Sequence, residues 1–168
     1  MATKWMFRCF TFVNIPMNFT EANDYCGWNA PNTWSNLALE ENDIHAVWLA
    51  SAFEKALQMY IHQNISGIAA TTFSARNYWI GVYRPTVYDN FRSILRPYLT
   101  FQHFAQINPS MNYVAGRTSD GKWTTMPEEE RLPFICSYKP VANIAILANT
   151  DNKSYMGWLK DFIYRRRH

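Results

Sequence analysis

The order of apolar and polar positions predicts several strands. CFTFV at 9–13 and YWIGVY at 78–83 have the aromatic and β-branched composition of strands, and Pro16 is expected to end the first one. YWIGVY is apolar at consecutive positions, so we expect it in the centre of a sheet. Three later runs, YVAG, KWTTM and LPFICSY, are expected to form a closing antiparallel set, with Asp120-Gly121 as a hairpin signal.

Two segments before the central strand have helical periodicity. NFTEANDYC at 18–26 predicts a short helix, in which Asn18 and Glu21 have the spacing of a capping box. Residues 42–62 predict a longer helix with two apolar stripes, so we expect it to be largely buried. The first stripe is Ile44, Val47, Trp48 and Ser51, and the second is Leu49, Phe53, Ala56, Leu57 and Tyr60.

Residues 84–111 lack periodicity, which is typical of a functional loop. Two early helices with later strands indicate an α+β fold.

The end of the chain, 140–168, predicts a separate extension. VANIAIL at 141–147 is apolar enough to form a further strand, and one apolar helical stripe follows it. The stripe consists of Tyr155, Trp158, Leu159, Phe162 and Ile163. A helix this short needs a surface to cover, which can be its own domain, another subunit or a membrane interface. We interpret the stripe as a partner or oligomer contact and do not favour the membrane.

Composition and charge restrict the function classes. The chain has 168 residues, 48% of them hydrophobic and 17% aromatic, which suits one core with an appendage. Residues 141–168 hold five basic and two acidic residues, which equals the whole net charge of +3. We therefore expect no nucleic-acid partner, because the basic residues sit at one end of the chain and are not spread over a face.

The sequence favours an extracellular protein although no signal peptide is recognised at its start. Arg8 and Cys9 interrupt the apolar residues of 1–12, and no run reaches the length of a membrane-spanning helix. Three Asn-x-Ser/Thr triplets are candidate glycosylation sites, which matter only in a secretory lumen. These triplets begin at Asn18, Asn64 and Asn152.

Several motifs in order give a family resemblance. From Trp5 to Tyr138 the chain resembles a C-type lectin-like domain, through CFTF, FTEANDYC, SNLALEEN, YWIGVY, GKWTT and PFICSY. The resemblance implies two helices flanking antiparallel sheets, with a long irregular loop. It assigns 1–139 to this domain and leaves 140–168 as a C-terminal extension.

The cysteines fit this resemblance in part. It implies a disulfide between Cys26 and Cys136, and it places Tyr113 and Glu128 where the family has its second bridge. Cys9 then has no partner in the chain. We expect it to be a buried thiol or to form an intermolecular disulfide.

The resemblance also identifies a calcium and sugar loop that has lost its carboxylates. Family members that bind sugar hold calcium with acidic and amide residues at positions that correspond here to 108–110 and 123–125. This chain offers only the amide of Asn108 and the hydroxyls of Ser110, Thr124 and Thr125. Calcium requires about 6 to 8 oxygens, with charge supplied by carboxylates. We therefore expect no metal and no other cofactor. Pro109 would preserve the shape of the loop if its peptide bond were cis, as is usual in calcium-binding relatives.

No pattern of residues supports an enzyme. The four histidines lack metal-ligand spacing, and neither a Cys-x-x-Cys pair nor a phosphate loop occurs. His103 is the one histidine inside the long loop, and the sequence shows no partner that would make it a catalytic base.

The sequence therefore predicts a non-catalytic extracellular binding module that is independent of calcium and that engages a protein partner or self-associates. Candidate ligand residues in the long loop are Tyr98, Phe101, His103 and Phe104, together with the residues at the former calcium positions. The loop aromatics can equally form a local mini-core. Two alternatives remain, a carbohydrate-binding lectin with an atypical site and a structural subunit of a homopolymer or matrix.

Overall fold

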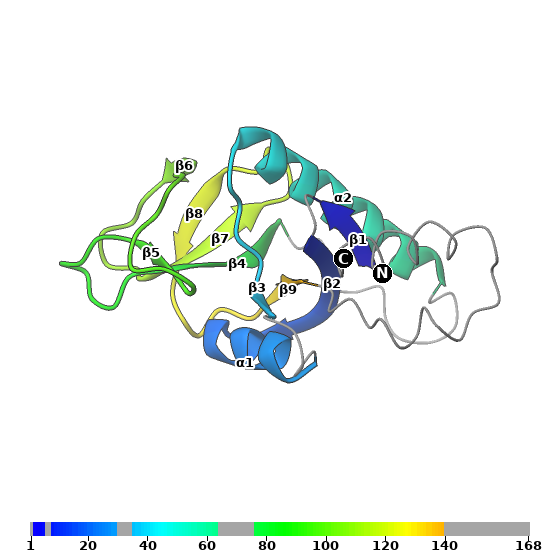
Figure 1. The fold of residues 1–168 in the computed structure, drawn as a ribbon, viewed down its shortest axis with the longest axis horizontal. Coiled ribbons are helices and arrows are strands. Elements are labelled where there is room, and N and C mark those ends of the chain that lie inside the picture. Colours follow the sequence, from blue (N-terminus) through cyan, green and yellow to red (C-terminus); the bar gives the residue numbers. More distant parts are fainter. Residues whose placement is uncertain (1, 6–7, 30–34, 64–75, 140–168) are drawn as a thin grey trace, which may run out of the picture.

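A computed structural model describes residues 2–5, 8–29, 35–63 and 76–139 of the chain (Figure 1). The apolar stripe of 155–163 and the sequons at Asn64 and Asn152 lie outside the described residues. The elements, in chain order, are β1 Ala2–Trp5, β2 Arg8–Met17, α1 Phe19–Asn29, β3 Asn36–Leu37, α2 Asp43–Gln63, β4 Asn77–Tyr83, β5 Arg92–Ser93, β6 Phe104–Gln106, β7 Tyr113–Arg117, β8 Trp123–Met126 and β9 Leu132–Tyr138.

These strands form one mixed sheet in the order β1-β2-β9-β4-β7-β8-β6, with β3 beside β9 and β5 beside β4. The strand YWIGVY is central, as predicted, and it pairs antiparallel with β7 and parallel with β9. Tyr78, Trp79 and Ile80 are all fully buried, because this part of the strand is covered on both faces. The sheet with its two helices confirms the predicted α+β class.

Helix α1 begins with the predicted capping box. The backbone N–H of Glu21 donates to Oδ1 of Asn18 at 2.8 Å, and the N–H of Asn18 donates to Oε2 of Glu21 at 3.1 Å. The helix extends three residues beyond the predicted end at Cys26. Cys26 is bonded to Cys136 of β9 with 5.3 Å between the Cα atoms, which confirms this disulfide. It closes a loop of 110 residues, which in the chain-entropy model stabilises the fold by about 4–5 kcal/mol.

The first predicted strand is longer than expected. β2 continues through Pro16 to Met17, so the prediction that Pro16 ends it is wrong. The pairing of β2 with β9 changes register between Val13 and Met17, and an irregular stretch of this kind can hold a residue without an N–H. Cys9 lies in β2 as a half-buried free thiol. Whether it forms an intermolecular disulfide stays a prediction.

Helix α2 buries only one of its two apolar stripes. Leu49, Phe53 and Ala56 are buried, whereas Ile44 and Val47 are 72% and 52% exposed. The prediction of a largely buried helix is therefore wrong. The helix lies along one side of the sheet, so the sheet covers a single face of it (Figure 1). In the part of the chain that the structure describes, neither helix has the length and apolar composition needed to cross a membrane.

The hairpin between β7 and β8 turns at the predicted residues. Asp120 accepts a hydrogen bond from the N–H of Lys122 at 3.0 Å and pairs with Arg117, and Gly121 has a φ of 70°. Asp120 is thus a turn residue, as the sequence indicated. The turn packs closely on α2, since a Cβ atom on Gly121 would lie 2.8 Å from the carbonyl carbon of Ala46.

Candidate functional site

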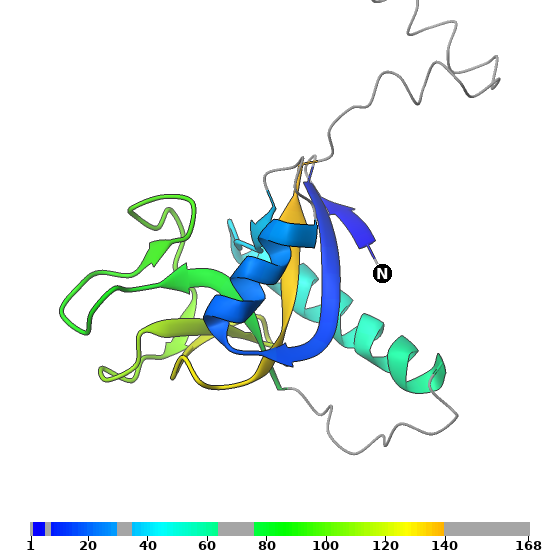
Figure 2. The ribbon, with the colours of Figure 1, turned by 90° about the horizontal axis from the view of Figure 1, so that it is seen from below.

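The long loop of residues 84–112 and strand β8 form the candidate site, and the loops project from one end of the molecule (Figure 2). The structure brings together the two segments that correspond to the family's calcium positions. The backbone N–H of Asn108 donates to Oγ1 of Thr125 at 2.7 Å. Thr125 is buried, and Thr124 beside it is half-buried.

The side chain of Asn108 is engaged within the loop itself. Its Oδ1 accepts hydrogen bonds from the backbone N–H of Ser110 at 3.0 Å and from the Ser110 hydroxyl at 2.8 Å. The best neutral oxygen at the former calcium position therefore already has two donors. The peptide bond before Pro109 is trans, since the described residues contain no cis peptide bond. The conditional expectation of a cis proline is not met.

Arg84 holds the inner side of this loop, and the sequence analysis did not identify it. The residue directly follows β4 and is buried. Its Nη2 donates to the backbone oxygens of Pro109 and Met111, the latter at 3.0 Å, and its Nε donates to Oδ1 of Asn112 at 3.2 Å. The guanidinium also lies 4.9 Å from the centre of the Phe91 ring. The guanidinium of Arg84 therefore links the start of the loop to residues 109–112 and to the ring of Phe91. A basic residue placed between the central strand and Pro85 was the available sequence signal.

Two of the predicted loop aromatics pack inward. Phe101 and Phe104 contact the buried ring of Trp123 edge-on, with centroid distances of 5.5 and 5.2 Å. Phe104 also contacts Phe91 at 4.9 Å. These contacts support the mini-core interpretation for both residues.

His103 has a partner that the sequence did not reveal. Its Nε2 lies 3.6 Å from Oδ1 of Asp43 at the start of α2, and its backbone oxygen accepts a hydrogen bond from the N–H of Trp123 at 2.8 Å. No local sequence signal indicates this contact, because Asp43 is distant from His103 along the chain. The contacts attach the loop to both α2 and β8.

The outer side of the loop exposes other aromatic residues. Tyr98 is 57% exposed, and Tyr88, which the sequence analysis did not select, is 97% exposed. Val87 and Leu95 are exposed as well. Tyr88 lies in a tight turn in which the Thr86 hydroxyl donates to Asp89 at 2.7 Å. Val87 and Tyr88 are therefore carried on a hydrogen-bonded turn of residues 86–89.

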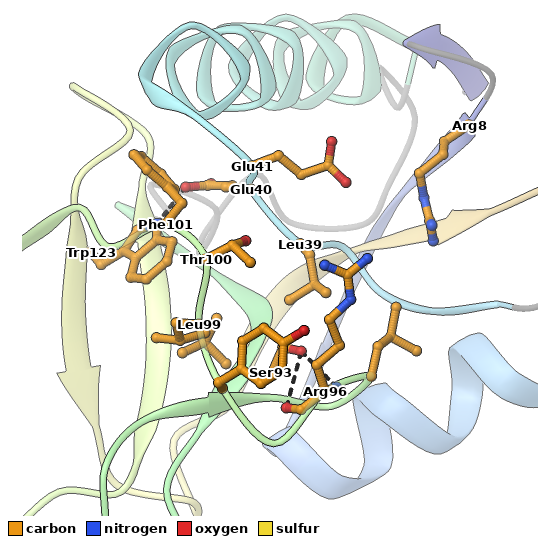
Figure 3. Close-up of a pocket in the computed structure, with 13 residues that line it drawn as sticks. Arg8, Leu39, Glu40, Glu41, Ser93, Arg96, Leu99, Thr100, Phe101 and Trp123 are labelled. Carbon is orange, nitrogen blue, oxygen red and sulfur yellow. Dashed lines mark hydrogen bonds between the residues drawn. The ribbon is translucent and has the colours of Figure 1, made fainter.

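A small pocket of about 60 Å³ lies between this loop and the segment that leads into α2 (Figure 3). Leu39, Leu99, Phe101 and Trp123 supply apolar walls, and Arg8, Arg96, Glu40 and Glu41 supply charged groups. Tyr98 also lines it. Tyr98 and Phe101, both predicted loop residues, therefore line one pocket, which the sequence did not predict.

Glu40 is the most unusual ionisable group of the pocket. Its carboxyl accepts hydrogen bonds from the Tyr78 hydroxyl at 2.9 Å and from the indole N–H of Trp123. Burial raises its pKa from 4.5 to about 7, and the two hydrogen bonds offset only part of that effect. Sequence reasoning treated Glu40 as part of a motif, and no local signal distinguishes it from Glu41.

His45, nearby on α2, is shifted in the opposite direction. Its ring is 1% exposed and lies 5.4 Å from the ring of Phe10. Burial, together with the positive charge of Arg8, lowers its pKa from 6.5 to about 4. The imidazole is therefore neutral at physiological pH.

Among residues 2–5, 8–29, 35–63 and 76–139, no group of three or more His, Cys, Asp or Glu side chains is arranged to hold a metal ion. That this chain binds no calcium stays a prediction.

Comparison with protein-family models gives no match, and neither does comparison with the sequences of curated proteins. Solved structures do match. Human lithostathine has a TM-score of 0.65 at 17% identity, covering 83% of this chain and 97% of its own. The mouse scavenger receptor C-type lectin carbohydrate-recognition domain has a TM-score of 0.63 at 13% identity, with 83% and 96% covered. Ovocleidin-17 of the Gallus gallus eggshell calcified layer has a TM-score of 0.60 at 18% identity, also with 83% and 96% covered.

These similarities confirm the fold that the sequence motifs indicated. The chain has a C-type lectin-like fold, with the long loop, the disulfide of α1 and the central strand in the expected places.

Proposed function

We propose that this chain is a non-catalytic binding module that recognises a protein partner through the outer side of its long loop, without calcium. The observation that carries the proposal is the position of Arg84. Its guanidinium reaches Met111 and Asn112 from inside the loop, so a side chain supplies the positive charge that organises the loop.

Electrostatics supports independence from calcium. A divalent ion beside Pro109 would lie close to the guanidinium of Arg84, which repels it, and would find the amide oxygen of Asn108 already engaged by Ser110. The hydroxyl of Thr125 is likewise engaged by the backbone of Asn108. A calcium ion would have to replace these hydrogen bonds without gaining a carboxylate.

The exposed side chains favour protein recognition. Tyrosine provides large contact area at low conformational cost, and exposed aromatic residues are enriched among those that dominate binding energy. Tyr88 and Tyr98 offer such area on a loop that is anchored to the core through Phe101 and Phe104.

A disulfide between Cys26 and Cys136 supports an extracellular location, since such bonds persist in oxidising compartments. The fold neighbours support a binding role, and one of them is itself a carbohydrate-recognition domain. Recognition of a glycan and self-association are the competing functions that the experiment separates.

The test immobilises the intact chain and its Tyr88→Ser and Tyr98→Ser variants, and measures capture of proteins from the extracellular fluid of the source tissue by mass spectrometry. Ile44→Ser is the matched control, because it removes from α2 an apolar side chain whose exposure, 72%, lies between those of Tyr98 and Tyr88. We expect one partner that is retained by the parent and the control, lost from both tyrosine variants, and unaffected by a chelator.

Two results would replace this proposal. Binding on a glycan array that a chelator abolishes would indicate a calcium-dependent lectin. A mass in sedimentation that grows with concentration, without any captured partner, would indicate a subunit of a homopolymer.

A further inference from the structure

The pocket of Figure 3 brings two guanidinium groups to the edge of an apolar hollow. Leu99 and Phe101 come from the long loop, Leu39 comes from the segment after β3, and Arg8 comes from the start of β2. These segments are far apart in sequence, so the pocket exists only in the folded chain. Its inner wall belongs to the core, since Phe101 packs against the buried Trp123 at 5.5 Å.

Each guanidinium is carried by a fixed backbone. Arg8 is half-buried in β2, and its Nη2 donates to Oγ of Ser137 at 2.8 Å. Arg96 follows a turn in which its own backbone N–H donates to Oγ of Ser93 at 2.9 Å. The side chain of Arg96 takes no part in that turn and is exposed.

Neither arginine has a carboxylate within ion-pair distance among the residues that the structure describes. The ion pairs found there involve His103, Arg117 and Arg131 instead. Glu41 attracts Arg8 from a greater distance, and its carboxylate is directed toward the same space (Figure 3). Glu40 also faces the pocket, but its carboxyl is held by Tyr78 and Trp123. Burial raises the pKa of Glu40 to about 7, so below that pH its carboxyl is mostly protonated and the two arginines exceed the remaining carboxylate of Glu41 by one charge.

We propose that this pocket binds a monocarboxylate with a short apolar stem, whose carboxylate lies between Arg8 and Arg96 and whose stem lies against Leu99 and Phe101. Guanidinium groups bind carboxylates through charge-assisted, paired hydrogen bonds. Tyr98 lines both this pocket and the outer side of the long loop, whereas Tyr88 does not line the pocket. The carboxylate site itself does not depend on the proposed protein partner.

Size and charge define the ligand class. A pocket of about 60 Å³ is well below the ~150 Å³ that accommodates a benzene ring, so only a group of a few carbon atoms enters it. An excess of one positive charge suits a monoanion better than a dianion such as phosphate. The carboxylate can belong to a free short-chain acid or to an acidic side chain of a peptide, since both present the same group on a short stem.

The experiment is ligand-observed fluorine NMR on the full chain with 4,4,4-trifluorobutyrate, with 4,4,4-trifluorobutanol as the neutral probe of similar shape. We expect saturable broadening of the acid signal and at least about tenfold weaker binding of the alcohol, because the alcohol cannot pair with the guanidiniums. Displacement of the acid by N-acetylglutamic acid α-amide would assign the site to an acidic side chain, and failure to displace it would assign the site to a free acid.

Three variants separate this site from nonspecific charge effects. Arg96→Gln should weaken binding of trifluorobutyrate by about tenfold, and Glu41→Gln should strengthen it by roughly 2- to 5-fold by removing the competing carboxylate. Arg92→Gln makes the same charge change outside the pocket and should leave binding unchanged. Equal binding of acid and alcohol, or equal losses in Arg96→Gln and Arg92→Gln, would overturn the proposal. So would weaker binding in Glu41→Gln.

Discussion

The hydroxyl of Tyr78 donates a hydrogen bond to Oε1 of Glu40 at 2.9 Å inside the core, and both side chains are almost fully buried. The other carboxyl oxygen accepts the indole N–H of Trp123. The three residues join the segment before α2 to β4 and β8. A carboxyl in this position connects the stability of the fold to pH near neutrality.

The first prediction concerns this pH dependence. Because the pKa of Glu40 is raised from 4.5 to about 7, the folded chain holds the proton more tightly than the unfolded chain. The resulting stability is complete below pH 4.5 and is lost as the pH rises to about 7. Glu40→Gln removes this titration while keeping an oxygen for Trp123. We expect the difference in unfolding free energy between the parent and the variant to change by on the order of 3 kcal/mol between pH 4.5 and pH 8.

Urea unfolding at several pH values measures this difference. His45 acts in the opposite direction, since its pKa is lowered to about 4, so its contribution is complete above pH 6.5 and is lost as the pH falls. The parent therefore shows a weak net dependence between pH 4.5 and 6.5 from these two groups, and Glu40→Gln reveals the rise due to His45. Parallel curves for parent and variant would contradict the prediction.

A second prediction tests Arg84. Arg84→Met leaves the backbone oxygens of Pro109 and Met111 without their donor, so we expect a loss of roughly 1–3 kcal/mol in stability. Limited proteolysis should show faster cleavage within 84–112. Arg92→Met is the control, because the described contact of Arg92 is with the ring of Tyr83 at 6.0 Å, and it should change stability by less than about 0.5 kcal/mol. Restored protection of Arg84→Met by added calcium would show that the loop retains a metal site.

A third prediction compares two glycines. Gly121→Ala places a Cβ atom 2.8 Å from the backbone of Ala46 at a residue with φ of 70°, so we expect a loss of about 2 kcal/mol or more. Gly27 lies in α1 with nothing within 4 Å of an added Cβ, so Gly27→Ala should stabilise by roughly 0.5–1 kcal/mol. Thermal unfolding of both variants measures the contrast, and equal shifts in the same direction would contradict it.

A fourth prediction concerns Asn18, which is both a helix cap and a candidate glycosylation site. The cap uses Oδ1, whereas an N-linked glycan is attached through the amide nitrogen, so the two roles are compatible. Asn18→Asp keeps the cap and removes the sequon. Asn18→Ala removes both and should cost about 1 kcal/mol.

Secretion from a eukaryotic host followed by intact-mass measurement tests the glycan, and unfolding of protein from a bacterial host tests the cap. We expect a glycan on the parent that Asn18→Asp lacks, with unchanged stability of the bacterial Asn18→Asp protein. An identical mass for parent and Asn18→Asp, apart from the substitution itself, would rule out modification at this site.

Local patterns predicted most of the secondary structure. The continuous apolar runs at 78–83 and 132–138 predicted strands that are buried on both faces, and the spacing of Asn18 and Glu21 predicted the start of α1. The end of β2 was missed, because a proline is tolerated where pairing is irregular and the sequence does not show the pairing partner.

The site was predicted less well. Tyr98, Phe101 and His103 were selected as a group, but one is exposed, one supports the core and one contacts Asp43.

By itself the sequence determined the main helices and strands, the absence of carboxylates at 108–110 and 123–125 and, through its motifs, the pairing of Cys26 with Cys136. These features depend on residue type and on order along the chain. Only the tertiary structure decided which stripe of α2 is covered, that Arg84 holds the loop and that Glu40 is buried while Glu41 is exposed. Burial and hydrogen bonding between distant segments depend on how the sheet places them, and neighbouring residues of the same type can therefore meet opposite environments.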